Sequence, residues 1–311
     1  MELTTVKTDK AKEYVRSTFN YNYSDIETIT IDQVKDYVQK SKTTPWDIVR
    51  IEPTWDREAL LKSALNEMTK VPMKVKDPEI YAESYSGISI QKVGVEKTEE
   101  EENYNSISRN SVPGEPIFTR IGTLYFTRSG FSSTPYPFTM MKDLPEDIIE
   151  IWKGIASKPG VTAPHYLNKW ATTWPKFLLR LAEHNVIAAR GRYLRAIPDQ
   201  YAKKHYDGEA RLHIPLTTND KCFFRFHHGS EDNKRINAYH LPVTGDAYLF
   251  NAYVPHDFGN FGDTERTHVV FGLPDHFHPG WPYYFPHFKT WEDVFEDYHS
   301  HLKSFPNPVE L

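Results

Sequence analysis

The sequence predicts a mainly β protein with flanking helices, an α+β chain whose helices pack outside a β-barrel. Two observations predict this class. Apolar and polar residues alternate in runs such as 117–130 and 266–271, which is typical of strands with one buried face. Amphipathic patterns of helical period lie on both sides of these runs, at residues 55–70 and 290–305.

Composition bounds the class of protein. The 311 residues are 39% hydrophobic and 14% aromatic, and large aromatic side chains allow a sizeable core. A formal net charge of −5 without a basic stripe argues against a nucleic-acid surface. The single cysteine, Cys222, argues against a disulfide framework and fits a reducing compartment. Because there is no long apolar run and no apolar leader, we expect a cytoplasmic protein without a membrane span.

The chain divides into three parts in this interpretation. Residues 1–110 form a mixed and helical region that packs on the core, and residues 111–275 form the catalytic core. Residues 276–311 form an aromatic-rich C-terminal segment with a helix. The charge run that begins the stretch 96–116 is read as a solvated loop separating the first two parts.

Helix start signals support the helical segments. The helical patterns cover residues 31–40, 55–70, 145–155, 173–187 and 290–305. Thr30 with Gln33 makes a capping box, and Thr54 and Thr290 are the expected N-caps of their helices. Pro175 falls in a first turn, where proline is tolerated. We expect the last helix to cover the barrel, with a pocket wall or a dimer contact as alternatives.

A candidate metal site begins at His205 and Asp207, an H-x-D pair. Residues two apart on a strand point to the same face, so this imidazole and carboxylate could hold one ion. His256 is the natural third ligand, since it follows a turn and another apolar run. Two histidines and one carboxylate leave other coordination positions open, and this mixed nitrogen and oxygen set suits non-haem iron.

Two Arg-x-His pairs accompany the metal site. If the chain turns at residues 260–263 and returns as a strand, Arg266 comes back beside the metal, with His268 on its face. In the same way Arg211 and His213 share one face of the preceding run. A guanidinium fork suits a carboxylate. A dicarboxylic keto acid could therefore chelate the metal at one end and meet Arg266 at the other.

The ordered pattern H-x-D, R-x-H-x-P-L, G-x-x-x-x-x-N, P-H, N and R-x-H, within residues 205–271, resembles the aspartyl/asparaginyl β-hydroxylase and proline hydroxylase family. The resemblance implies a double-stranded β-helix (jelly roll) core and an Fe(II)- and 2-oxoglutarate-dependent dioxygenase. It places the metal ligands at His205, Asp207 and His256. It places Arg266 on the far carboxylate of 2-oxoglutarate, and Arg211 and His213 in the cosubstrate pocket, where His268 is a further candidate.

This resemblance implies hydroxylation of an unactivated C–H of an amino acid, free or in a peptide, with O2 consumed and succinate and CO2 released. The retained Asp207 favours hydroxylation over halogenation, which would need that coordination site. Two alternatives stay open: a zinc-dependent hydrolase using an activated water, and a non-catalytic binding module on the same barrel. His227 and His228 fall in an expected polar loop and are read as solvated.

Overall fold

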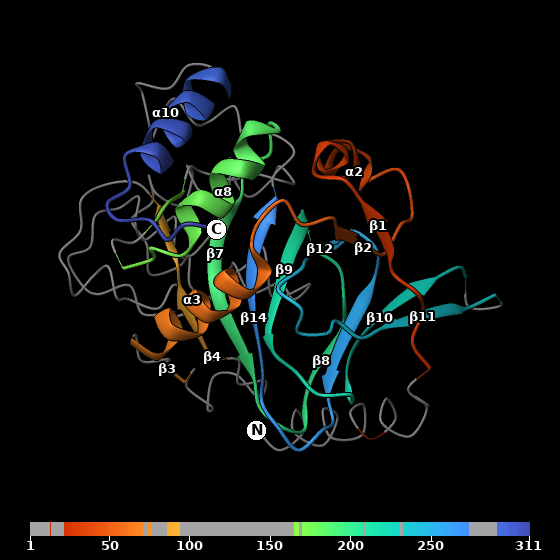
Figure 1. Ribbon diagram of the computed structural model, residues 1–311. Coiled ribbons are helices and arrows are strands. Elements are labelled where there is room, and N and C mark those ends of the chain that lie inside the picture. Colours follow the sequence, from red (N-terminus) through yellow and green to blue (C-terminus); the bar gives the residue numbers. More distant parts are fainter. Residues whose placement is uncertain are drawn as a thin grey trace, which may run out of the picture.

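The structure, a computed structural model, describes residue 13 and the ranges 22–70, 74–75, 86–93, 165–167, 170–207, 209–230, 233–273 and 291–311. Two β-sheets face each other, and helices lie over the outer side of the larger sheet (Figure 1). Three predicted features lie outside the described residues: the charged loop at 96–116, the strand at 117–130 and the helix at 145–155. The aromatic segment before residue 291, with Thr290, lies outside them as well.

The core is formed by eight consecutive strands, β7 to β14. They span Ala189–Ala196, Gln200–His205, Ala210–Thr217, Cys222–His228, Arg235–Tyr239, Ala247–Phe250, His256–Asn260 and Arg266–Leu273. In space, β12-β9-β14-β7 form the centre of the larger sheet and β11-β10-β13-β8 form the smaller one. All these neighbours are antiparallel. This strand order is that of a double-stranded β-helix, so the predicted fold class is confirmed.

Strands from the N-terminal region extend the larger sheet at both edges. β1 (Glu27–Ile29) and β2 (Ile48–Ile51) follow β12, whereas β4 (Ser86–Ser89) and β3 (Lys74–Val75) follow β7. A separate pair joins β5 (Gln91–Val93) to β6 (His165–Leu167). The N-terminal region therefore contributes strands to the sheet itself, and the boundaries near residues 110 and 275 stay predictions.

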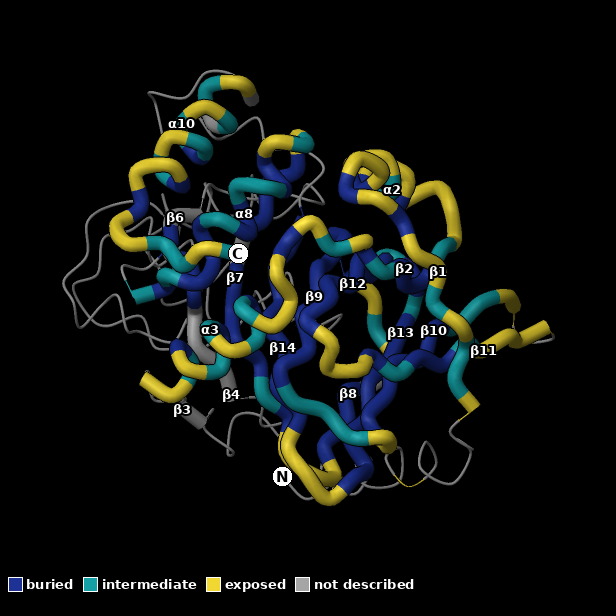
Figure 2. The backbone as a smooth tube through the Cα atoms, in the orientation of Figure 1, coloured by how far each residue is buried: buried dark blue, intermediate teal, exposed yellow. Residues whose placement is uncertain are grey.

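The larger sheet has two different faces, as the alternation predicts. Val269 and Phe271 of β14 and Leu212 of β9 belong to the apolar core beneath the helices. Val270, between the first two, belongs to a second apolar cluster that fills the space between the sheets, together with Phe226 of the smaller sheet. Alternation along β14 thus places Val270 on the face opposite to Val269 and Phe271, as expected of a strand. Figure 2 shows these central strands buried along their length.

The helices within the described ranges are η1 (Ile31–Gln33), α2 (Val34–Lys40), α3 (Arg57–Lys70), α8 (Trp174–Glu183) and α10 (Trp291–Lys303). The expected capping box is present, and the Thr30 N–H donates to Gln33 Oε1 at 2.9 Å. Pro175 lies in the first turn of α8, as predicted. No helix within the described ranges combines the length and the apolar character needed to cross a bilayer.

The predicted N-cap of α3 was wrong. Asp56, not Thr54, caps this helix, because its Oδ1 accepts the N–H groups of Glu58 and Ala59, both at 3.0 Å. The helix consequently begins at Arg57 and not at Trp55. Trp55 is instead buried against Phe177 of α8, and its Nε1–H donates to the Gly245 carbonyl at 2.9 Å.

Candidate metal centre

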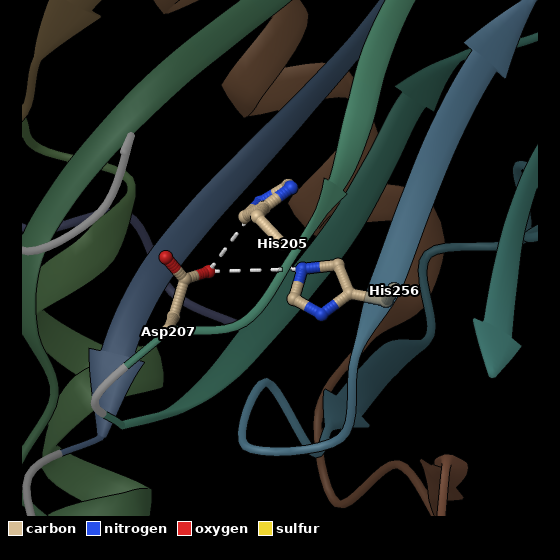
Figure 3. A group of neighbouring side chains, drawn as sticks. All are labelled: His205, Asp207 and His256. Atoms are coloured by element: carbon tan, nitrogen blue, oxygen red, sulfur yellow. Dashed lines mark ion pairs between the residues drawn. The ribbon is translucent and has the colours of Figure 1, made fainter. Parts of the chain in front are cut away.

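His205, Asp207 and His256 meet at one end of the barrel, as Figure 3 shows. Each offers a ligand atom, and these atoms all lie within 4.8 Å of one another. Asp207 Oδ2 is 3.9 Å from His205 Nε2 and 3.7 Å from His256 Nε2. Two metal–ligand bonds of about 2 Å that meet at a right angle place their donor atoms about 3 Å apart, so side-chain shifts of about 1 Å would let one ion bind all three.

The strand pairing brings these side chains together. His205 is the last residue of β8 and His256 the first of β13, and the two residues are partners in the register of this pair. Their rings lie 4.4 Å apart between centroids. Asp207 lies just beyond the end of β8, and its backbone N–H donates to the Ala252 carbonyl at 2.7 Å. That bond holds the carboxylate against the loop that leads into β13.

His256 is prepared to act as a neutral ligand. Its Nδ1 lies 2.9 Å from the Val254 carbonyl, which can only accept, so Nδ1 carries the proton and Nε2 is left with its lone pair. Burial, followed by the neighbouring His205, lowers the pKa of His256 to about 3. The ring therefore stays uncharged at neutral pH, which is the state a metal needs.

The Asp207 carboxylate fits a bound cation. Asp207 is 3% exposed, yet its Oδ2 receives no well-directed hydrogen bond from any described residue. The same atom is 2.9 Å from Arg211 Nη2, an ion pair that lacks good hydrogen-bond geometry. Arg211 compensates the charge of this buried carboxylate, while the Oδ2 lone pairs, which accept no hydrogen bond from the described residues, stay available to a metal ion. One nitrogen from each histidine and this oxygen are the donors that Fe(II) prefers in its two-histidine, one-carboxylate sites.

A second cluster lies deeper between the sheets and contains the other predicted residues. Arg266 is 2% exposed, and its Nη2 donates to His268 Nδ1 at 2.6 Å. Its guanidinium also lies over the rings of Phe258 and Phe224, at 4.5 and 5.1 Å from their centroids. His268 Nδ1 is in turn 3.4 Å from His213 Nδ1. The two Arg-x-His pairs are thus brought to one interior, as the sequence predicts.

The contact with Arg266 fixes the position of the proton on His268. Since a guanidinium only donates, His268 Nδ1 accepts and its proton sits on Nε2. That buried Nε2 has no hydrogen-bond partner in the described part of the chain. Burial, and then the Arg266 charge, lower the pKa of both His268 and His213 well below the usual value. An orphaned buried donor beside a buried guanidinium indicates that the interior accommodates an acceptor-rich ligand.

The turn that returns Arg266 to the site is held by Asn260. Its side-chain Nδ2 donates to the carbonyls of Ala196, Ile197 and Thr264, at 3.2, 3.1 and 3.0 Å. Its Oδ1 accepts from Asn219 Nδ2 at 3.0 Å. The predicted reversal at residues 260–263 is therefore confirmed, and Asn260 orients the start of β14.

Sequence reasoning missed one residue that shapes the metal centre. Asn251 is fully buried, and its Nδ2 donates to the carbonyls of Ser41 and Thr44 at 3.1 and 3.2 Å. Its Oδ1 accepts the Tyr253 N–H at 3.2 Å. These bonds fix the loop before His256. The asparagine of the G-x-x-x-x-x-N pattern was the available signal, although its partners are distant in sequence.

The interpretation of His227 and His228 as loop residues was wrong. Both lie in β10, on opposite faces of the strand, and each contacts a buried carboxylate. His227 Nε2 is 2.9 Å from Asp257 Oδ2, and His228 Nε2 is 2.7 Å from Asp47 Oδ1. The polar residues after His228 made this segment resemble a loop. Both carboxylate partners come from other parts of the chain, so no local pattern indicated these contacts.

Comparisons with known proteins give no family assignment. No family model matches the sequence, and no curated protein matches it. Among solved structures, a 2OG-Fe(II) oxygenase family oxidoreductase from Burkholderia pseudomallei has a TM-score of 0.39 at 12% identity, covering 81% of this chain and 97% of that one. A Pseudomonas putida prolyl-4-hydroxylase has a TM-score of 0.35 at 9% identity, and the match covers 78% of this chain and 98% of that one. HygX from Streptomyces hygroscopicus, with nickel, 2-oxoglutarate and hygromycin B bound, has a TM-score of 0.33 at 9% identity, and the match covers 77% of this chain and 86% of that one. Similarity at this level does not establish common function, which therefore rests on the geometry of the site.

Proposed function

We propose that this protein is an Fe(II)- and 2-oxoglutarate-dependent oxygenase that hydroxylates an unactivated C–H of an amino acid or of a residue in a peptide. Succinate and CO2 are the coproducts. The observation that carries the proposal is the meeting of His205, Asp207 and His256 ligand atoms within 4.8 Å of one another, in a barrel that also encloses Arg266.

Each residue has a defined role in this proposal. His205, Asp207 and His256 would hold the Fe(II) ion, and 2-oxoglutarate would bind beside them. Arg211, at 2.9 Å from Asp207 Oδ2, orients that carboxylate. When bound, the iron and 2-oxoglutarate supply the oxidising chemistry that an unactivated C–H requires.

The deeper cluster binds the other end of the cosubstrate. The Arg266 guanidinium meets the far carboxylate, since it offers a planar fork of donors. Neutral His268 can donate its Nε2–H to the same ligand, and His213 lies beside it. The rings of Phe224 and Phe258 pack on Arg266 and keep water away from it, so the ion pair forms in a medium of low polarity.

The test is spectroscopic and is done without air. Fe(II) and then 2-oxoglutarate are added to the metal-free protein, and the expected result is a weak visible charge-transfer band. His256→Ala should abolish the band, whereas His227→Ala, which changes a histidine on the outer face of the smaller sheet, should keep it. Full occupancy by Zn(II) with no band in the presence of Fe(II) would support the zinc hydrolase, and no metal uptake would support a binding module.

A further inference from the structure

Another polar cluster, separate from the one around Arg266, lies at the same end of the barrel as the metal centre. It consists of Asp47, His228, Asn237 and Tyr239, and we call it the Asp47 cluster. Asp47 Oδ1 is 2.7 Å from His228 Nε2, while Oδ2 accepts from Asn237 Nδ2 at 2.6 Å and from the Tyr239 hydroxyl at 3.0 Å. The Asp47 side chain is 4% exposed and that of His228 is 12% exposed, so the cluster is nearly buried but reachable at His228.

Strand alternation places this cluster on the inner face of the smaller sheet. Phe224 and Phe226, which precede His228 at intervals of two along β10, belong to the apolar cluster between the sheets. Tyr239 belongs to it too. His227 points the other way, toward Asp257. His228 therefore lies on the face that the metal ligands use, at the end where β10 finishes and β13 begins.

The cluster and the metal centre are connected through one loop and one ring. Asn251 donates its N–H to the Asp47 carbonyl at 2.8 Å, and the next residue, Ala252, accepts the Asp207 N–H at 2.7 Å. The Phe226 ring lies 5.7 Å from the Tyr239 ring and 5.8 Å from the His256 ring, between centroids. The two centres therefore flank the same buried ring, Phe226.

The charge of the cluster indicates what it can bind. All three contacts of the Asp47 carboxylate come from side chains that donate hydrogen bonds, and no described arginine or lysine pairs with it. The carboxylate only accepts, so His228 Nε2 carries the proton and donates it. In the neutral ring, which is the form that can take up an ammonium group, His228 Nδ1 is an acceptor, and it has no hydrogen-bond partner among the residues described. The negative charge of the Asp47 carboxylate, at the Nε2 side of the ring, makes Nδ1 a stronger acceptor.

We propose that the Asp47 cluster is a substrate subsite that binds a primary ammonium group through His228 Nδ1, with Asp47 supplying the compensating charge. The inference rests on the proposed function and deepens it, because it names an amine-bearing substrate. The interior thus offers the Arg266 guanidinium to an anionic cosubstrate and the Asp47 carboxylate to a cationic substrate group.

The experiment measures succinate release by the iron-loaded full chain with 2-oxoglutarate and air. One probe set is the twenty free amino acids with tetrapeptides that have a free N-terminus; the other is the same compounds with the amine acetylated. We expect the free set to stimulate succinate release and the acetylated set to do so at least about tenfold less, since hydrogen bonds to charged groups are strong. Equal stimulation by both sets, or by neither, would overturn the subsite.

Variants separate this role from a structural one. His228→Gln keeps a side chain that can donate to Asp47 but moves the acceptor, and we expect the KM for the best free-amine probe to rise about 10- to 100-fold. Asp47→Asn should act in the same direction. His227→Gln, the matched control on the opposite face of β10, should leave that KM within about twofold, because His227 faces Asp257 and not the interior between the sheets. An equal effect of His227→Gln and His228→Gln would overturn the proposal.

The charge-transfer band distinguishes the two possible failures. In the proposal, His228→Gln leaves the band and the affinity for 2-oxoglutarate unchanged, because His228 contacts neither the iron ligands nor Arg266. A normal band with no preference for free amines would remove the subsite and leave the oxygenase standing. A missing band in the unaltered protein would remove the oxygenase, and the subsite would fall with it.

Discussion

Acid should destabilise the metal-free protein steeply, because three imidazoles are buried without charge between the sheets. His213, His256 and His268 are 4%, 3% and 1% exposed. Burial is the main cause that lowers the pKa of each, to about 3 for His256 and well below the usual value for the other two. In the unfolded chain each pKa returns to about 6.5. Below that pH the unfolded state binds more protons than the folded state.

The magnitude follows from proton linkage. The unfolding free energy rises with pH when the unfolded state holds more protons, so these groups contribute stability above pH 6.5 that is lost as the pH falls. Each group contributes up to about 1.4 kcal/mol per pH unit, and the three together up to about 4 kcal/mol per pH unit. Integration from pH 7 to pH 5.5 gives a loss of about 4 kcal/mol. This is a large part of the 5–15 kcal/mol typical of a domain.

Urea denaturation of chelator-treated protein at pH 7 and pH 5.5 measures this loss. Few Asp and Glu side chains titrate in this window, since their usual pKa values lie near 4. His268→Gln, which can still accept from Arg266, should reduce the loss by about a third. A loss below about 1.5 kcal/mol, or a loss that His268→Gln leaves unchanged, would show that these rings are not neutral in the fold.

Three further changes test other parts of the molecule. Arg266→Ala should weaken 2-oxoglutarate binding by about 10- to 150-fold while iron still binds, because a hydrogen-bonded contact to a charged group is worth about 1.5–3 kcal/mol. Titration of the charge-transfer band measures this affinity, and an unchanged affinity would contradict the assignment. Phe271→Ala should lower the free energy of unfolding, measured by urea denaturation, by about 3–5 kcal/mol, since its ring packs on Trp174 and Phe177. A loss below about 1 kcal/mol would contradict that packing. Asp56→Ala should lower the free energy of unfolding by about 1 kcal/mol because the α3 cap is lost, whereas Thr54→Ala should leave it almost unchanged. The reverse order would support Thr54 as the cap.

The sequence predicted those features that depend on local periodicity. Alternation along β14 separates Arg266 and His268 from Val269 because neighbouring residues of a strand face opposite sides of the sheet. The reversal at Asn260 was predictable for a similar reason, since turn residues separate two apolar runs. The sequence also pointed to His205, Asp207 and His256 as one group, and the structure places their ligand atoms within 4.8 Å of one another; their role as metal ligands stays a prediction.

Other features depend on partners that are distant in sequence and could not be predicted. Thr54 and Asp56 are both good N-cap residues, and only the direction of the backbone N–H groups decides between them. His228 resembles a loop residue until Asp47, from the other side of the barrel, is known to bind it. The addition of β2 to the edge of β12 likewise depends on a long-range register that no local pattern specifies.

Metal stoichiometry tests the central claim most directly. Anaerobic titration of Fe(II) into the metal-free full chain, followed by calorimetry, should give one ion per chain, and His205→Ala and His256→Ala should each abolish binding while His227→Ala retains it. Each of the first two variants deletes one of only three protein ligands that the described residues offer. Undiminished binding of one ion in His205→Ala and His256→Ala, or no binding by the unaltered protein, would contradict the assignment of this site.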